Sequence, residues 1–417
     1  MSANKNAIQK NIIWNTVGSL FYLMCQWLTT VAVVRFSDGY ADAGVLSIAM
    51  SVTMIFSVIA LFNVRNYQVS DSDNVYSSGD YLFHRIFTCV LAFLSCAVFS
   101  FAVYDSYTAL SIVAYMTVKV AEAFADALHG EAQKNWRLDI AGKSNIIRGV
   151  LLITSFSVTL ILWKNLALSI TVMAISNILP LIFYDYRSVT KERSIILKPD
   201  IQKLKRLTLI CLPMVCYGIC INAIVPFARC MLEYYHGEEV LGYYASIATI
   251  AVLIQSLMTL IFTPLIGIFD NYYRAKDKRH IVILLIKLFF ILILVSVLAI
   301  AASAFIGEFA LTFIFGEEIS QYSYLLYPAI IISALSALLW LLGMLLVVMR
   351  DTKTLLIGAI SGFTLAIILS VTLIRDTIYT GTNISVIAAL SVIVFIYIFR
   401  FIMYLLSRNG TGESFND

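Results

Sequence analysis

Long apolar stretches alternate with short polar segments along the entire chain. Each stretch is about 18 to 27 residues long, and about 20 apolar residues in a helix span the hydrocarbon core of a bilayer. The pattern predicts an all-α polytopic membrane protein with about twelve transmembrane helices. The predicted spans cover residues 12–34, 43–63, 82–104, 106–128, 146–163, 166–184, 207–228, 243–269, 281–304, 325–349, 354–374 and 383–406.

Two of the polar links between these spans are very short. A turn at Asp105 joins the third and fourth spans, and Lys164-Asn165 joins the fifth and sixth. Helices joined by such short links are antiparallel neighbours. The sequence therefore predicts two such helix pairs in the first half of the chain.

The distribution of basic residues supports this layout and predicts its orientation. With a cytoplasmic N-terminus, 23 of the 29 lysines and arginines fall in cytoplasmic segments or towards the cytoplasmic ends of spans, among them Arg85 and Arg148, and 4 fall in outer segments. Lys119 and Lys287 fall inside spans. Cytoplasmic loops of membrane proteins carry an excess of Lys and Arg. Both termini are therefore predicted to be cytoplasmic.

Composition narrows the functional classes. Apolar residues make up 60% of the 417 residues and charged residues 13%, about half the charged share of a soluble domain. A soluble core cannot bury so much apolar surface, so soluble enzymes, nucleic-acid-binding proteins and secreted disulfide scaffolds are excluded. The seven cysteines form no C-x-x-C pair and the four histidines are scattered, so no metal site and no cofactor are predicted. Composition alone indicates a polytopic inner-membrane protein, such as a transporter.

The longest hydrophilic stretch divides the chain in the middle. It is basic and runs from Arg187 to Arg206. We predict an N-terminal six-helix lobe at residues 1–190, a basic cytoplasmic linker at 191–206 and a C-terminal six-helix lobe at 207–417. Because six is even, both lobes enter the membrane in the same direction, which permits a parallel repeat.

Three short motifs carry a family resemblance, and the first two of them occupy matching places in the two halves. The motifs are Val34-Arg35-Phe36 with Asp42-Ala43-Gly44, Arg229-Cys-Met-Leu with Leu241-Gly242-Tyr243-Tyr244, and Phe313-Ile-Phe-Gly316-Glu317-Glu318. In order and spacing they resemble Wzx-type polysaccharide flippases of the multidrug/oligosaccharidyl-lipid/polysaccharide exporter superfamily. The similarity extends over the whole chain in helix count and two-lobed layout.

This resemblance implies a fold and a substrate. The fold is two six-helix bundles around a central cavity in the bacterial cytoplasmic membrane. The substrate is an oligosaccharide on an undecaprenyl diphosphate carrier, which an ion-coupled alternating-access cycle moves from the inner to the outer leaflet. Expected partners are this lipid-linked oligosaccharide, membrane lipids, and the polymerase and glycosyltransferases of the same pathway. No nucleic acid and no enzymatic activity are expected.

The fourth predicted span holds the most informative polar residues. Lys119, Glu122 and Asp126 follow spacings of three and four, which place them on one helix face. An ionisable group at bilayer depth costs about 3 kcal/mol or more, so this face does not point at lipid. Two interpretations are open. In the first, Lys119 and Glu122 neutralise each other against another helix, with Arg148 beyond Asp126. In the second, the face lines the cavity, where Lys119 contacts the anionic substrate and Glu122 or Asp126 exchanges a coupling ion.

Three arginines at span ends are further candidates for substrate binding. Arg35 and Arg229 end the first and seventh spans on the predicted outer side, and Arg65 lies at the inner end of the second. A guanidinium is well suited to binding phosphate. Arg65 would act on the loading side, and Arg35 and Arg229 at the exit. The alternative is that these arginines anchor helix ends at the membrane interface.

Two other functions compete with the flippase hypothesis. A cation-coupled drug exporter of the same superfamily would share the fold. A membrane glycosyltransferase or polymerase would need a nucleotide-sugar site, for which Asp71-Ser72-Asp73 is the candidate motif. No P-loop accompanies it, so ATP is not the direct energy source. The sequence names neither the glycan nor the coupling ion.

Overall fold

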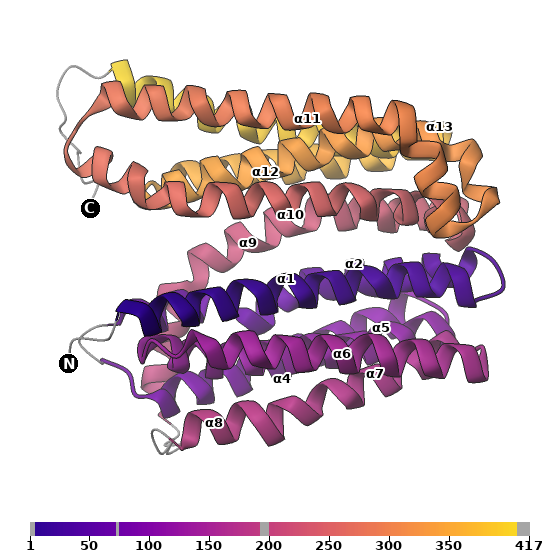
Figure 1. The fold of residues 1–417 in the computed structure, drawn as a ribbon, viewed down its shortest axis with the longest axis horizontal. Coiled ribbons are helices and arrows are strands. Elements are labelled where there is room, and N and C mark those ends of the chain that lie inside the picture. The colour runs from indigo at the N-terminus through magenta and orange to yellow at the C-terminus, as the bar shows by residue number, and fades with distance from the viewer. Residues whose placement is uncertain (1–4, 72–74, 192–199, 407–417) are drawn as a thin grey trace. The chain divides into compact units, whose positions relative to one another are not determined.

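A computed structural model describes residues 5–71, 75–191 and 200–406 of the chain (Figure 1). Every regular element in these ranges is helical. Ten of the described helices are long and apolar enough to cross a membrane, and α10 is a further helix of 37 residues. The prediction of an all-α polytopic membrane protein is confirmed, with ten to twelve membrane-length segments.

The helices follow one another with short connections. Their bounds are α1 (Lys5–Phe36), α2 (Ala41–Leu61), α3 (Val64–Ser70), α4 (Ser78–Val103), α5 (Ser106–Lys134), α6 (Leu138–Trp163), α7 (Leu166–Pro180), the π-helix η1 (Leu181–Tyr186), α8 (Arg187–Thr190), α9 (Ile201–His236), α10 (Glu238–Arg274), α11 (Lys278–Phe315), the 3-10 helix η2 (Glu317–Leu325), α12 (Leu326–Val348) and α13 (Thr352–Leu406).

Polar side chains fix several helix starts. The backbone N–H of Asp80 donates to the Ser77 hydroxyl, and the Asp80 carboxylate accepts from the Ser77 backbone N–H, which is a capping box at the start of α4. Asp105 caps α5 and Asn165 caps α7. The two short links predicted at Asp105 and Lys164-Asn165 are therefore present.

The last helix differs from its prediction. The sequence pattern predicts two spans, 354–374 and 383–406, and α13 contains both of them as two helical arms, but the connection between them is shorter than predicted. Helical structure continues through it, and only Ile378 leaves the helical region (φ 45°, ψ −115°). The segment contains no proline, and the Thr377 and Thr382 hydroxyls donate to backbone carbonyls four residues earlier. A single non-helical residue therefore replaces a loop.

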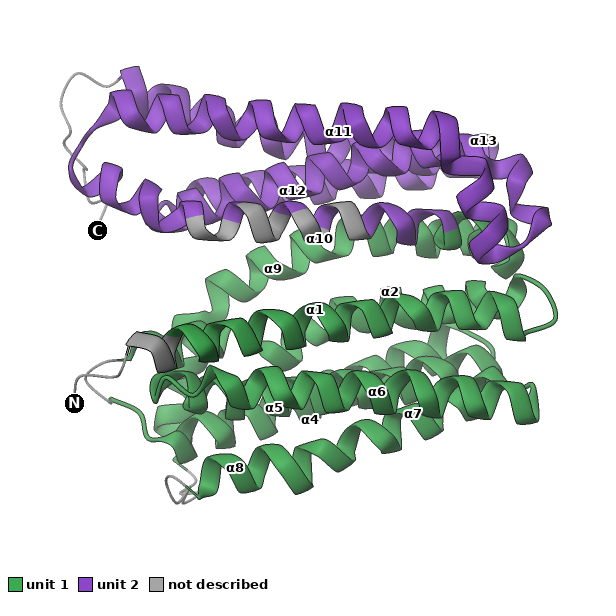
Figure 2. Ribbon diagram, in the orientation of Figure 1, with its two compact units in different colours: residues 1–246 green, residues 247–417 purple. Residues whose placement is uncertain are grey.

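The chain divides into two compact units, residues 1–246 and 247–417 (Figure 2). We refer to them as the first and second units. Their boundary lies C-terminal to the linker predicted at 191–206, because α9 packs against α2 and α4 of the first unit. The division into lobes at 1–190 and 207–417 stays a prediction about the membrane repeat. Residues 192–199 of the linker lie outside the described residues.

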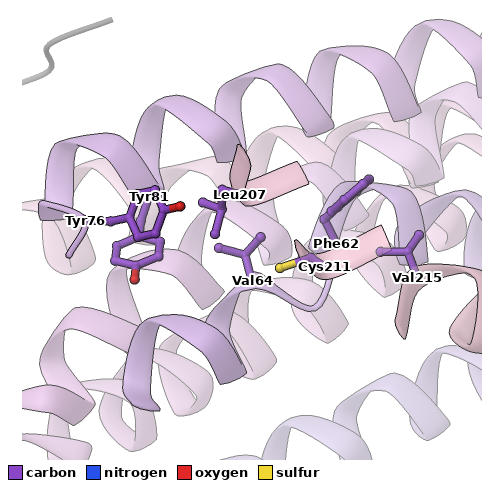
Figure 3. Packing of buried hydrophobic residues seen from close by; sticks show 7 residues of the cluster. All are labelled: Phe62, Val64, Tyr76, Tyr81, Leu207, Cys211 and Val215. Atoms are coloured by element: carbon purple, nitrogen blue, oxygen red, sulfur yellow. The ribbon is translucent and has the colours of Figure 1, made fainter. Parts of the chain in front are cut away.

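An apolar cluster and two polar contacts hold α9 in the first unit. The cluster consists of Phe62, Val64, Tyr76, Tyr81, Leu207, Cys211 and Val215 (Figure 3). Beside it, Lys203 Nζ lies 2.8 Å from Asp80 Oδ2, and His84 Nε2 lies 3.1 Å from Thr208 Oγ1. Apolar packing and polar contacts thus join α9 to α4.

Glycines allow two close helix contacts in the first unit. Where α1 meets α6, a Cβ at Gly142 would lie 2.1 Å from the Trp14 carbonyl oxygen. Where α2 and α10 begin, a Cβ at Gly44 would lie 1.9 Å from the Glu238 oxygen, and one at Gly242 would lie 2.0 Å from the Tyr40 oxygen. Only glycine permits such approach of two backbones. Gly44 and Gly242 thus each approach the carbonyl oxygen that lies four residues before the other glycine.

In the second unit, α13 folds back on itself. Added Cβ atoms at Gly358 and Gly362 would meet Tyr397 and Ile393, which pairs the two arms antiparallel about Ile378. The Tyr397 hydroxyl donates to the Leu355 carbonyl oxygen at 3.0 Å. Packing between the arms therefore supports the reversal at Ile378.

Candidate functional site

A cavity of about 320 Å³ lies among the helices of the first unit. Five charged side chains and one histidine line it, together with Tyr22 and Asn145. They come from α3, α5 and α6, and they are Arg65, Lys119, Glu122, Asp126, His129 and Arg148. Because ionisable groups inside a membrane are costly, a cluster of this size requires mutual pairing, a ligand, or both.

Glu122 is the most fully satisfied carboxylate of the cavity. Lys119 Nζ lies 2.9 Å from Glu122 Oε2. The other carboxylate oxygen of Glu122, Oε1, accepts a hydrogen bond from the Tyr22 hydroxyl and one from the Gln26 amide at 3.0 Å. Three donors from α1 and α5 therefore compensate this buried negative charge. The Lys119–Glu122 pair of the sequence prediction exists, and both of its members also line the cavity.

Asp126 bridges two arginines from different helices. Arg65 Nη1 of α3 donates to Asp126 Oδ1 at 2.8 Å, and Arg85 Nη2 of α4 donates to Oδ2 at 3.0 Å. Arg85 is fully buried and also donates to the Ala60 carbonyl oxygen at 2.7 Å. The exposed fractions of the Arg65 and Asp126 side chains are 30% and 22%, so this pair borders the cavity. Arg65 is therefore partly exposed beside the cavity, whereas Arg85 is not exposed.

A third charged group joins α5, α6 and η1. Arg148 Nη2 donates to Asp185 Oδ2 at 2.8 Å, and His129 Nε2 lies 3.1 Å from Asp185 Oδ1. Asp185 lies in the π-helix η1 that follows Pro180, and its side chain is completely buried. A π-helical turn often marks a functional position in a helix. His129 and Arg148 both line the cavity, whereas Asp185 lies behind them.

The structure brings four of the six predicted site residues together. Lys119, Glu122, Asp126 and Arg65 line one cavity. Arg35, at the end of α1, is exposed, and Arg229, within α9, is half-buried; neither lines this cavity. Their predicted roles at an exit stay predictions.

Sequence reasoning missed several members of the site. His129 follows Asp126 by three residues on the same face of α5, so the spacing used for Lys119 would have found it. Arg148 was expected beyond Asp126, but its partner is Asp185. Arg85 and Arg148 were counted with the cytoplasmic ends of their spans, but they are buried within α4 and α6. Asp185 lies just beyond the predicted sixth span. No spacing rule connects the last three, because they come from different helices.

Asp71 of the D-x-D motif has structural contacts. Its carboxylate accepts from the Tyr81 hydroxyl at 2.7 Å and from the backbone N–H groups of Val75 and Tyr76 at 3.0 and 3.1 Å. Burial raises the pKa of Asp71, but these hydrogen bonds outweigh it and hold the pKa below its usual value. Asp73 lies outside the described residues. In the described part of the chain, no group of three or more His, Cys, Asp and Glu side chains has the geometry of a metal site.

Solved structures share this fold over nearly the whole chain. An inward-facing multidrug resistance MATE family transporter of the MOP superfamily matches with a TM-score of 0.72 at 11% identity, over 96% of this chain and 100% of that one. The lipid II flippase MurJ, in an inward closed conformation, matches with a TM-score of 0.72 at 13% identity, over 93% of this chain and 87% of that one. The chain therefore has the fold of a MOP superfamily transporter.

A distant sequence relative adds a biological context. The capsular polysaccharide biosynthesis protein CapF of Staphylococcus aureus is 23% identical over 317 residues, which are 75% of this chain and 78% of that protein. No protein-family model matches the chain. The resemblance inferred from the sequence motifs is thus confirmed as a shared fold with distant homology to a capsule biosynthesis protein. The two solved structures compared above are of a transporter and a flippase.

Proposed function

We propose that this protein is a flippase for lipid-linked oligosaccharides. It moves undecaprenyl-diphosphate-linked repeat units from the inner to the outer leaflet of the bacterial cytoplasmic membrane, for synthesis of a capsule, O-antigen or exopolysaccharide. The shared fold supports transport, the lipid II flippase supports a lipid-linked substrate, and the relative CapF supports a surface polysaccharide.

The observation that carries this proposal is the charge of the cavity. Its lining includes the cations Arg65, Lys119 and Arg148 against the carboxylates Glu122 and Asp126. A diphosphate has negative charges that cannot cross a bilayer without partners. Cations at depth supply such partners, whereas a cationic drug would be repelled by the same lining. The cavity therefore favours the flippase over the drug exporter.

The proposed substrate-binding residues act in sequence along the path. Arg65 acts on the loading side, Lys119 at depth, and Arg35 and Arg229 at the exit. Successive weak contacts are needed because a single tight site would trap the lipid. The twelve-span topology, with two six-helix bundles around a central cavity and both termini cytoplasmic, belongs to the same proposal.

The proposed coupling residues are Glu122 and Asp126. Asp126 is held by Arg65, so a phosphate that takes over Arg65 leaves this carboxylate with one cationic partner fewer. A carboxylate in that state binds a proton or a small cation more readily. Substrate binding and ion binding are thereby linked through one arginine.

Deletion of the gene tests the proposed function. Cells lacking the protein should accumulate complete lipid-linked repeat units on the inner leaflet, as measured by lipid extraction with leaflet-selective labelling. A block in assembly of the repeat unit itself would instead indicate a glycosyltransferase. Normal export with altered drug sensitivity would indicate a drug exporter.

Labelling of single cysteines tests the proposed topology. Residues Asp200 and Lys278 should react only from the cytoplasmic side, and Asp105 and Gly237 only from the outside. An external report from Asp200 would overturn the six-plus-six arrangement, and with it the parallel repeat.

A further inference from the structure

One buried arginine of the cavity is only partly satisfied. Arg148 is 1% exposed. Its Nη2 donates to Asp185, and its Nε donates to the Ser144 hydroxyl at 3.2 Å. Its Nη1 is itself buried and has no hydrogen-bond partner, and the residue lines the cavity. A buried guanidinium N–H without a partner is costly, so Arg148 can gain a hydrogen bond when an acceptor enters the cavity and reaches Nη1.

Charge around the cavity also leaves a place for an anion. The buried or cavity-lining cations are Arg65, Arg85, Lys119 and Arg148, and their carboxylate partners are Glu122, Asp126 and Asp185. In these contacts four cations meet three carboxylates, which leaves one positive charge among them. One bound anionic group would neutralise the excess.

We propose that Arg148 binds a phosphate of the lipid-linked substrate through Nη1. This proposal rests on the function proposed above and adds a binding residue to it. Asp185 and His129 are positioning residues: Asp185 fixes one edge of the guanidinium, and His129 holds Asp185 from α5. A planar guanidinium fixed on one edge presents its remaining N–H groups in a defined direction, which suits a phosphate oxygen.

The other buried arginine shows why Arg148 is singled out. Arg85 is equally buried and its Nε also has no partner, but it does not line the cavity, and its two Nη atoms bond Asp126 and Ala60. Arg85 is therefore a structural cation. Arg148 shares its cavity with Lys119, Arg65 and the amide of Asn145. A cavity of about 320 Å³ is at the small end of ligand pockets, which suits the phosphate part of the substrate and not a whole oligosaccharide.

Binding to the purified full-length protein in lipid nanodiscs tests the proposal. The probes are undecaprenyl diphosphate, inorganic pyrophosphate and phosphatidylglycerol. Wild type should bind undecaprenyl diphosphate and gain thermal stability from it. Arg148→Gln should weaken this binding about tenfold or more and abolish the thermal shift, and Arg148→Lys should weaken it less. Arg137→Gln, just before the same helix, is the matched control and should bind as wild type does.

Each outcome decides a specific point. Unchanged affinity in a folded Arg148→Gln would overturn the role of Arg148 while leaving the flippase proposal intact. Equal competition by phosphatidylglycerol would assign the site to a membrane phospholipid and overturn its role in substrate binding. Absence of undecaprenyl diphosphate binding by wild type would overturn the flippase proposal itself. If Arg148→Gln does not fold, Arg148→Lys decides, because wild-type affinity in that variant would contradict the proposed guanidinium contact.

Discussion

The two compact units bury different kinds of polar side chain. The first unit buries charged or titratable groups, among them Arg85, His129, Arg148 and Asp185. Among the described residues of the second unit, no charged side chain is buried; its buried polar residues are Ser333, Ser370, Thr382, Asn383 and Ser385. Both units are nevertheless built from long apolar helices.

This difference separates two ways of stabilising a membrane helix bundle. A buried hydroxyl can bond within its own helix, as when Ser385 donates to the Gly381 carbonyl oxygen at 2.7 Å. A buried charge requires a partner from another helix, as when Arg85 meets Asp126. The ionic contacts of the first unit therefore depend on exact packing of several helices. They are also the groups that can exchange a protein partner for a phosphate or a coupling ion.

The largest effect is expected from breaking a buried ion pair in the first unit. Arg85→Leu leaves Asp126 with only Arg65 and should lower the free energy of unfolding by about 3–5 kcal/mol. Arg400→Leu, which removes the more exposed Arg400–Asp351 pair of the second unit, should cost about 1 kcal/mol or less. Equilibrium unfolding of the two purified variants, compared with wild type, measures both losses in free energy of unfolding. Equal losses would remove the distinction between the units.

A smaller effect is expected at a glycine contact. Gly142→Ala forces a methyl group against the Trp14 carbonyl and should destabilise the first unit by about 1–3 kcal/mol. Gly267→Ala in the second unit meets nothing within 4 Å, so it should be neutral or slightly stabilising through helix propensity. The thermal unfolding midpoints of the two variants, measured in the same detergent, compare the two effects. A neutral Gly142→Ala would show that α1 and α6 do not pack as closely as described.

The smallest effect is expected outside the membrane, where the units should behave alike. Burial raises the pKa of Asp351, but the Arg400 contact and a bond from the Thr354 N–H outweigh it, so the pKa is lowered, as it is at Asp71. A lowered pKa stabilises the fold above the usual Asp value of about 3.9, and this stability is lost as the pH falls through the folded-state value. Asp71→Asn and Asp351→Asn should each cost about 1 kcal/mol or less at pH 7.

Thermal midpoints from pH 7 down to pH 3 check this pair. The difference from wild type should shrink for both variants as the carboxylates become protonated. A penalty that persists unchanged at pH 3 would show that the negative charge is not what stabilises these two turns.

Much of the fold is predictable from the sequence because span length and charge distribution are local properties. Asp105 and Asn165 mark helix starts by their own side chains. The reversal at Ile378 is not predictable in this way, since a single residue without proline performs it. The connection predicted there rested on the low hydropathy of the residues between the two spans. A helix end that extends beyond the hydrocarbon core has equally low hydropathy.

The site is predictable only along one helix. Spacing places Lys119, Glu122 and Asp126 on one face of α5, and the structure shows that face on the cavity. Arg148 and Asp185 come from α6 and η1, and their pairing depends on helix packing that no single-sequence spacing encodes. Both residues lie near the ends of predicted spans, next to polar segments, so the sequence alone does not distinguish them from residues of the connecting segments.

Export of glycan per protein molecule in Lys119 variants tests the central claim most directly. The claim is that the cavity of the first unit handles an anionic substrate by charge. Lys119→Ala should reduce export strongly at normal protein abundance, and Lys119→Arg should retain much of it. Lys287→Ala, an exposed lysine in α11 of the second unit, should be mild. Lower abundance of Lys119→Ala with unchanged export per molecule would mean that the Lys119–Glu122 pair is purely structural and would contradict the account.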